Sequence, residues 1–302
     1  MKQSVSLTAL IFGVFALSTS AIFVKLAESP SAITAFYRLL FTLLLLLPSV
    51  LFSRKRRAEF HNLGKKQRIL SVSAGILLAI HYILWFESLN YTSVASSTVI
   101  VTLQPLFSIL LETIFLKERQ NKVALVGCLI AIAGSCVIGY GDFQSGSQAL
   151  LGDLLALLAA AFISIYFFIG QLMRKTTSAS LYSVLGYSGS VIFLAIYALI
   201  NQESFFPYPS ATWQCFFGLA VVSTIFGQFL FNLLLKWCSA TTVSMSILGE
   251  PVGTCILAFF ILHETIGARQ GIGIAVILGG LTLYFLSGTI STHLKCGSDM
   301  KI

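Results

Sequence analysis

The chain has 302 residues, of which 57% are hydrophobic and only 10% are charged. A soluble domain carries about 25% charged residues, so this composition excludes an ordinary globular protein and indicates that most of the chain lies in lipid. The formal net charge of +8 would indicate nucleic-acid binding only if the chain were soluble. Here the basic residues follow the loops between apolar segments, and we expect no nucleic-acid partner.

Apolar segments of about twenty residues follow one another along the chain, which is helix length rather than barrel-strand length. They predict an all-α membrane protein with ten transmembrane helices. The first segment also resembles a secretory signal, but its apolar run continues and nine more segments follow, which favours a span. The expected spans are residues 6–26, 31–52, 69–89, 95–116, 122–140, 151–172, 181–201, 212–235, 241–262 and 268–288.

Lys and Arg residues predict the orientation. With the N-terminus in the cytoplasm, 16 of the 19 basic residues fall on the cytoplasmic side, seven of them between the second and third spans. The positive-inside rule therefore predicts a multi-pass protein of the cytoplasmic membrane with both termini in the cytoplasm. The basic run 54–57 can also contact anionic lipid.

The two halves of the sequence partly repeat each other at an offset of 146 residues. Each half holds five spans, an odd number, so the second half must be inserted upside down relative to the first. We expect one membrane domain made of two inverted five-helix repeats, residues 1–145 and 146–302. The offset carries Gln104-Pro105 onto Glu250-Pro251, Ser93 onto Ser239, Glu118 onto Glu264, Gly127 onto Gly273 and Gly134 onto Gly280.

Four spans each carry one polar face at helical spacing. Polar groups in a bilayer are costly and usually face protein or water, so these faces favour a wet central cavity, with interhelical hydrogen bonding as the alternative. The glycines of the last span in each half allow helices to approach closely. The candidate substrate-binding residues on the polar faces are His81, Tyr82, Trp85, Gln104, Gln228, Asn232 and Glu250.

Glu250 is the sharpest candidate, because the following proline frees a backbone carbonyl in mid-span. Its carboxyl could bind an amine or exchange a proton, or it could be a structural contact between helices. Gln104, at the equivalent position, cannot titrate. His81 could bind substrate, gate the cavity, relay a proton or simply join two helices. Tyr82 and Trp85 could form an aromatic wall for a cationic ligand.

Arg38 lies one turn into the second span. It could meet an anionic substrate or pair with a carboxylate. Because it lies near the end of the span, extension of the side chain to the membrane surface is the simpler interpretation. We expect Glu118 and Glu264 to cap helices or fix loops rather than to touch substrate.

Several local patterns stand out together: Ala35-Phe36-Tyr37-Arg38, the stretch 95–105, and Leu116-Lys117-Glu118 with its counterpart Leu262-His263-Glu264. With the ten spans in two halves, they resemble the EamA-type family of the drug/metabolite transporter superfamily. The resemblance implies a central cavity built from spans three, four, eight and nine, with help from one, two, six and seven. It also implies efflux, or less often uptake, of small organic metabolites. Spans five and ten are expected to be peripheral and available for a homodimer.

We therefore predict a secondary transporter that moves amino acids, aromatic or cationic compounds by alternating access, in the direction of efflux. Uptake or exchange of a nucleoside-like metabolite such as S-adenosylmethionine, and a scaffold that transports nothing, are the alternatives. The sequence has no CxxC, HExxH, P-loop or GxSxG motif, so we expect no enzymatic activity, metal or cofactor. Proton coupling is a hypothesis that depends on Glu250 and His81.

Overall fold

The computed structural model describes residues 3–92, 94–118, 120–139, 147–261 and 267–287. Every regular element in these residues is helical, and nine of their helices are long and apolar enough to cross a membrane. A shorter apolar helix at Lys122–Val137 occupies the place of the expected fifth span. The prediction of an all-α membrane protein is therefore confirmed. The prediction that Glu264 caps a helix or fixes a loop concerns a residue outside the described ones.

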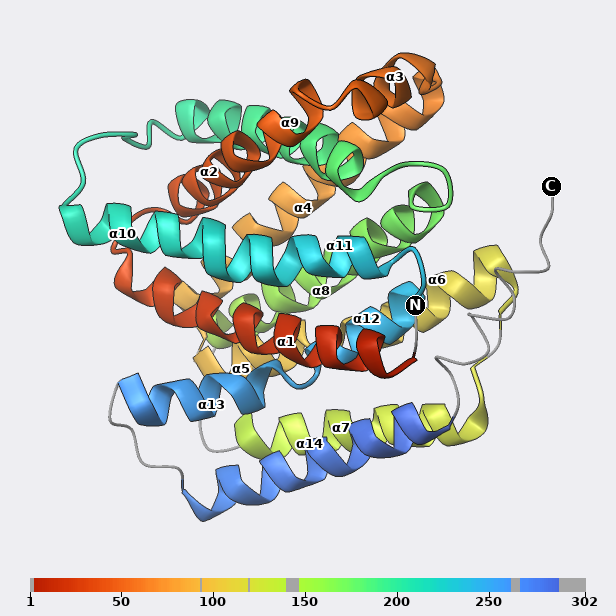
Figure 1. Cartoon of the computed structure of the whole chain (residues 1–302). Coiled ribbons are helices and arrows are strands. Elements are labelled where there is room, and N and C mark those ends of the chain that lie inside the picture. The colour runs from red at the N-terminus through yellow and green to blue at the C-terminus, as the bar shows by residue number, and fades with distance from the viewer. Residues whose placement is uncertain (1–2, 93, 119, 140–146, 262–266, 288–302) are drawn as a thin grey trace.

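The helices run roughly along one direction, and the short helix α3 lies at the end of the bundle where α1 begins (Figure 1). We call this end the α3 end. The first-half elements are α1 (Gln3–Leu26), α2 (Ser31–Leu51), α3 (Arg54–Asn62), α4 (Lys65–Tyr91), α5 (Val94–Val101), α6 (Gln104–Leu111), the π-helical η1 (Glu112–Leu116) and α7 (Lys122–Gly139). The second-half elements are α8 (Ser147–Met173), α9 (Ala179–Ile200), α10 (Ser210–Gly218), the π-helical η2 (Leu219–Phe229), α11 (Leu230–Leu234), α12 (Ala240–Ile247), α13 (Glu250–Ile261) and α14 (Ala268–Leu286).

The fourth and ninth spans are each interrupted in the middle. The first break separates α5 from α6, and the second separates α12 from α13. Pro105 and Pro251 stand at the second position of the following half-helix, and a proline has no N–H to donate to the turn before it. At each break the backbone bonds reach three residues back instead of four, which tightens the turn.

The two halves pack on each other in a reciprocal way. In the first half, α1 packs on η2 and α13, while in the second half α8 packs on α4, α5 and α6. The second helices of the two halves, α2 and α9, pack on each other. As a result α1 borders the break in the ninth span, and α8 borders the break in the fourth.

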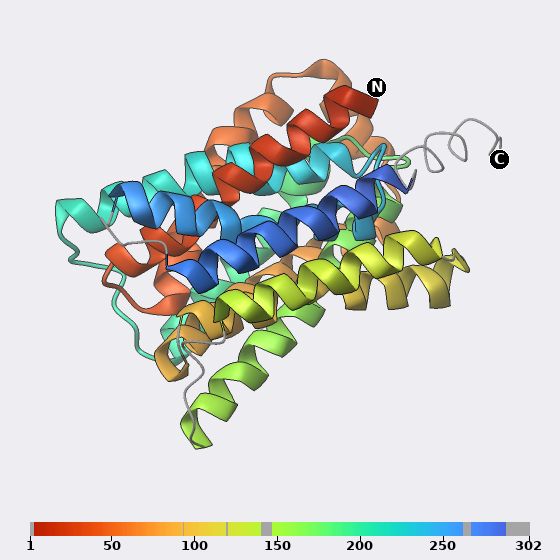
Figure 2. The same ribbon diagram turned by 90° about the horizontal axis from the view of Figure 1, so that it is seen from below.

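The last helices of the halves, α7 and α14, lie side by side along one side of the bundle (Figures 1 and 2). Gly127 and Gly134 form the close contacts. A Cβ added at Gly127 would lie 2.7 Å from the backbone oxygen of Gly280, and one added at Gly134 would lie 2.9 Å from that of Gly273. The predicted close approach is confirmed where Gly127 and Gly134 meet Gly280 and Gly273, whereas a Cβ added at Gly271 or Gly279 would meet nothing within 4 Å.

Candidate functional site

A buried cavity lies where the two interrupted spans meet. Its volume is about 30 Å³, which is room for roughly two water molecules and too little for an organic metabolite. Both interrupted spans contribute to it, together with α1, α2, α4, α8 and η2. The lining residues are Leu17, Arg38, His81, Tyr82, Trp85, Val101, Gln104, Ile163, Phe167, Gln228, Ile247 and Glu250.

Seven of the eight predicted site residues line this cavity. They come from elements of both halves, and none of the seven is more than 7% exposed. These seven side chains are therefore almost wholly shielded from solvent in this conformation. The seven residues are Arg38, His81, Tyr82, Trp85, Gln104, Gln228 and Glu250.

Most of the lining consists of pairs of residues that are 146 positions apart. These pairs place the cavity where equivalent parts of the two halves meet. Arg38, His81, Trp85 and Phe167 have no equivalent in the lining and make its two sides unequal. The pairs are Leu17 with Ile163, Tyr82 with Gln228, Val101 with Ile247, and Gln104 with Glu250.

Two serines hold the backbone at the two breaks. Ser18 on α1 donates to the backbone oxygen of Glu250 at 3.1 Å. Ser164 on α8 donates to the backbone oxygen of Gln104 at 2.9 Å. The serines are themselves 146 residues apart, so the same contact is made twice. Neither serine stands out in the sequence by itself. The 146-residue offset, applied to the first and sixth spans, pairs Ser18 with Ser164.

Arg38 is fully buried, so the interpretation that it extends to the membrane surface is wrong. Its Nε donates to Thr224 Oγ1 at 2.8 Å, and its Nη1 donates to Ser20 Oγ at 2.7 Å. The guanidinium lies over the Tyr82 ring, 4.4 Å from its centre. It forms no ion pair with a carboxylate of the described residues. Residues of both halves thus hold the Arg38 guanidinium in a fixed position beside the cavity.

Six polar atoms of the lining residues have no hydrogen-bond partner within the described ranges. They are the donors Arg38 Nη2, Trp85 Nε1 and Gln228 Nε2, the acceptors Gln104 Oε1 and Glu250 Oε1, and Tyr82 Oη, which can donate or accept. A buried polar atom without a partner costs about 1–3 kcal/mol, so such atoms call for an explanation. Their gathering at one cavity fits a ligand that supplies both acceptors and donors.

His81 joins two helices and also lines the cavity. Its Nδ1 lies 2.9 Å from the backbone oxygen of Ala159, which joins α4 to α8. A carbonyl oxygen only accepts, so Nδ1 carries the proton and Nε2 can accept one. The ring also stacks on Trp85, with centres 6.0 Å apart, and lines the cavity.

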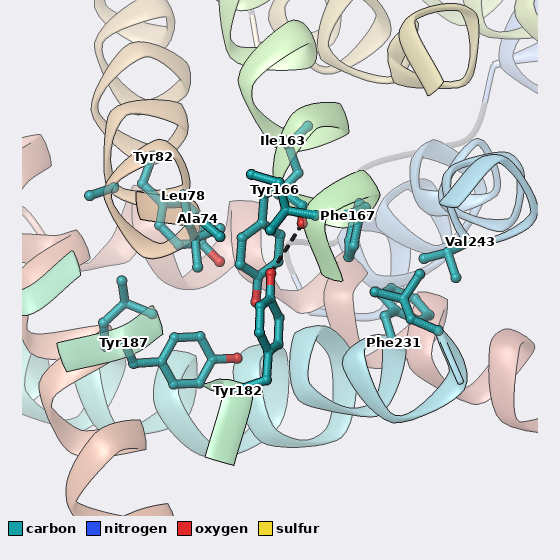
Figure 3. Close-up of a cluster of buried hydrophobic side chains, with 14 of the residues drawn as sticks. Ala74, Leu78, Tyr82, Ile163, Tyr166, Phe167, Tyr182, Tyr187, Phe231 and Val243 are labelled. Atoms are coloured by element: carbon teal, nitrogen blue, oxygen red, sulfur yellow. Dashed lines mark hydrogen bonds between the residues drawn. The ribbon is translucent and has the colours of Figure 1, made fainter. Parts of the chain in front are cut away.

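Asn232 is the one predicted site residue that the structure does not bring to the cavity. Its Nδ2 donates to Tyr166 Oη at 2.6 Å and to Ser183 Oγ at 3.0 Å. The ring of Tyr166 lies in a buried cluster with Tyr182 and Tyr187 (Figure 3). Asn232 therefore joins α11 to α8 and α9 rather than facing the cavity.

At the α3 end, the start of α12 is held by side chains from both halves. The wholly buried Glu112 accepts from Thr241 N at 3.0 Å and from Thr241 Oγ1 at 2.7 Å. Gln171 Oε1 accepts from Ala240 N at 2.8 Å. These contacts close the space between the fourth and ninth spans at this end.

The EamA-like transporter family model matches residues 4–140 and matches again at residues 150–286. The chain belongs to the EamA-like transporter family. Its two matches begin 146 residues apart, the offset that also relates the pairs of cavity residues.

Relatives in several organisms are named as transporters. An uncharacterized transporter of Synechocystis sp. is 26% identical over 80% of this chain and 71% of its own length. An uncharacterized transporter of Archaeoglobus fulgidus is 25% identical over 87% of this chain and 91% of its own length. A solute carrier family 35 member of Xenopus tropicalis is 26% identical, over 60% of this chain and 49% of its own.

A solved crystal structure shares the fold, with a TM-score of 0.77 over 95% of this chain and 98% of the other, at 17% identity. Together with the apolar helices, the family and its named relatives make this chain a multi-pass membrane transporter.

Proposed function

We propose that the chain is a secondary transporter that moves small organic metabolites across the cytoplasmic membrane by alternating access. The observation that carries the proposal is the small buried cavity between the two helix breaks, with unmatched polar donors and acceptors around it. A scaffold has no need of such a cavity. Efflux is the proposed direction because the family resemblance implies it more often than uptake.

The proposed architecture is two inverted five-helix repeats with both termini in the cytoplasm. Support comes from the reciprocal packing of α1 and α8 and from the equivalent contacts of Ser18 and Ser164. Two inverted halves can exchange conformations, which opens one central site first to one side and then to the other. Dimer formation through α7 and α14 stays a prediction.

Contacts at opposite ends of the bundle are suited to act as the two gates. At the α3 end, Glu112 binds the start of α12 through Thr241. At the other end, Thr92 Oγ1 donates to Asp153 Oδ1 at 2.9 Å and joins the end of α4 to α8. In our proposal each contact breaks in turn, and the cavity widens toward the side that opens.

The charges of the cavity favour a zwitterionic substrate such as an amino acid. Arg38 Nη2 and Trp85 Nε1 can donate to a carboxylate, while Gln104 Oε1 and Glu250 Oε1 can accept from an ammonium group. Nucleoside-like metabolites with an amino-acid end are the second candidate, because the stacked His81 and Trp85 rings offer a surface for a base. Glu250 is also the proposed site of proton exchange.

Transport by purified protein in vesicles tests this proposal. A labelled panel of amino acids, organic cations and S-adenosylmethionine is offered with and without a pH gradient. We expect a zwitterion to move, and we expect Glu250→Gln to remove the effect of the gradient. The matched control is Glu87→Gln, because Glu87 lies on α4 outside the cavity and contacts Asn90.

The outcomes separate the parts of the proposal. Transport that ignores the gradient and survives Glu250→Gln would exclude proton exchange at Glu250. Movement of cations alone would contradict the zwitterion. If well-folded protein moves no member of a broad metabolite panel while a native relative does, the proposed transport of metabolites is wrong for this chain.

A further inference from the structure

Helix α3 and the start of α4, which lie at the α3 end of the bundle (Figure 1), carry a strongly basic surface made of residues that do not line the cavity. All five of its charged side chains are exposed, and none has a hydrogen bond or ion pair with the described residues. We call this set the basic surface. Its members are Arg54, Lys55, Arg57, Lys65 and Lys66.

The carboxylate of Glu59 on α3 forms no ion pair with these cations in the described part of the chain. Glu59 Oε1 accepts from the backbone N–H of Ser178, in the turn between α8 and α9, at 2.5 Å. Gln67 Nε2 donates to Thr176 Oγ1 in the same turn at 3.2 Å. Both contacts fix α3 and the start of α4 against the second half of the chain, so the basic surface has a defined position.

Two other basic residues of this region are used in the fold. Arg56 Nη1 donates to the backbone oxygen of Ser49 at 2.6 Å, at the end of α2. Arg68 Nη2 donates to the backbone oxygen of Phe60 at 2.8 Å, and its guanidinium lies over the Phe60 ring. Since these two cations already have partners, the five of the basic surface are the ones left for a ligand.

A shallow groove continues the basic surface along α4. Lys65 and Lys66 stand at its rim, and Ile69, Leu70 and Ser73 line the rest. Ile69 is 55% exposed. A free phosphate or the phosphate backbone of a nucleic acid has no apolar part that would contact such a groove. A phospholipid carries an anionic headgroup next to an apolar chain, so it can contact both the lysines and the apolar residues.

We propose that the basic surface binds anionic phospholipid, with the headgroup phosphate at Lys65 and Lys66 and the start of an acyl chain along Ile69 and Leu70. The remaining cations of α3 bind neighbouring headgroups. This inference goes beyond the proposed function and does not depend on the substrate. Because Glu59 ties α3 to the turn after α8, a bound lipid supports the contact between the two halves.

Native mass spectrometry of the full chain in detergent tests the proposal with equal amounts of phosphatidylglycerol and phosphatidylcholine. We expect phosphatidylglycerol to be retained preferentially. Four cations are neutralised together, with Arg54→Gln, Arg57→Gln, Lys65→Gln and Lys66→Gln. This variant should lower the preference for phosphatidylglycerol by about tenfold or more, since each basic residue near an anionic membrane surface adds to the attraction for anionic lipid.

The matched control neutralises four other exposed lysines at the same end, with Lys117→Gln, Lys122→Gln, Lys175→Gln and Lys236→Gln. This control should keep its preference for phosphatidylglycerol. Equal losses in both variants would show a general effect of net charge and overturn the proposal. Unchanged binding in the first variant would overturn it too. Displacement of the lipid by millimolar inorganic phosphate would show that the surface takes free phosphate instead. Size-exclusion profiles confirm that both variants fold.

Discussion

The two halves of the chain give the cavity the same frame but different chemistry. Ser18 and Ser164 make equivalent contacts to the two breaks, and Val101 and Ile247 occupy equivalent places in the lining. The polar atoms differ, because Glu250 in the second half stands where the first half has a glutamine. A duplicated backbone thus supplies the place for a ligand, and unequal side chains supply its recognition.

The cation of the cavity shows the same division. Arg38 belongs to the first half, and the position 146 residues later holds Val184, which lies outside the lining. The carboxyl of Glu250 belongs to the second half. The cavity therefore has its cation on the side of the first half and its carboxyl on the side of the second. The opposite charges of a zwitterion match this arrangement.

The largest expected effect comes from removing the cation of the first half. Arg38→Gln should lower transport of a carboxylate-bearing substrate by roughly a hundredfold, because hydrogen bonds to charged groups contribute about 1.5–3 kcal/mol each. Arg56→Gln, which removes an arginine outside the cavity, should leave transport unchanged. Initial rates in vesicles measure both. Equal rates for Arg38→Gln and the native chain would remove Arg38 from substrate binding.

The next prediction exchanges the polar residues of the two halves. Glu250→Gln alone should lower transport of an ammonium-bearing substrate by about tenfold or more, the loss of one charge-assisted contact. Combining it with Gln104→Glu places the carboxyl at the equivalent position of the other half. If the frame is truly shared, the double variant recovers part of the lost transport. A double variant slower than Glu250→Gln would contradict a shared frame.

A smaller effect is expected at the gate of the α3 end. Glu112→Gln weakens the contact with the start of α12 by about 1 kcal/mol, so opening toward this end should become several-fold more frequent. Labelling of Ile247→Cys from the side of the α3 end, which is the cytoplasmic side in the proposed topology, measures it, with Glu87→Gln as the control. Reduced labelling would show that Glu112 does not hold this end closed.

The smallest prediction compares the two serines directly. Ser18→Ala and Ser164→Ala should each lower the free energy of unfolding by about 1 kcal/mol or less, and by similar amounts. Ser188→Ala is the control, since Ser188 donates only within its own helix, to Val184 O. Denaturant unfolding in detergent measures the three. A loss confined to one of the two serines would show that the breaks are not held alike.

Much of the fold and of the site could be predicted from apolar length and from the offset. Two failures have physical causes. Arg38 was expected at the membrane surface because its partners Ser20 and Thr224 come from other spans, and periodicity along one helix does not reveal such contacts. Asn232 was expected on the same face as Gln228. Its amide is instead bonded to Tyr166 on α8 and Ser183 on α9, and contacts between distant spans are not revealed by spacing along one helix.

The central claim is that the cavity opens alternately to the two sides of the membrane. Val101→Cys and Ile247→Cys test it most directly, because they are equivalent lining residues without polar chemistry. Each is placed in a chain whose six native cysteines are replaced, and a water-soluble thiol reagent is applied to either side of sealed vesicles during transport. Lys175→Cys, exposed at the α3 end, controls for sidedness. We predict labelling of both positions from both sides, with protection by substrate. Labelling of both positions from one side only, or from neither, would contradict alternating access.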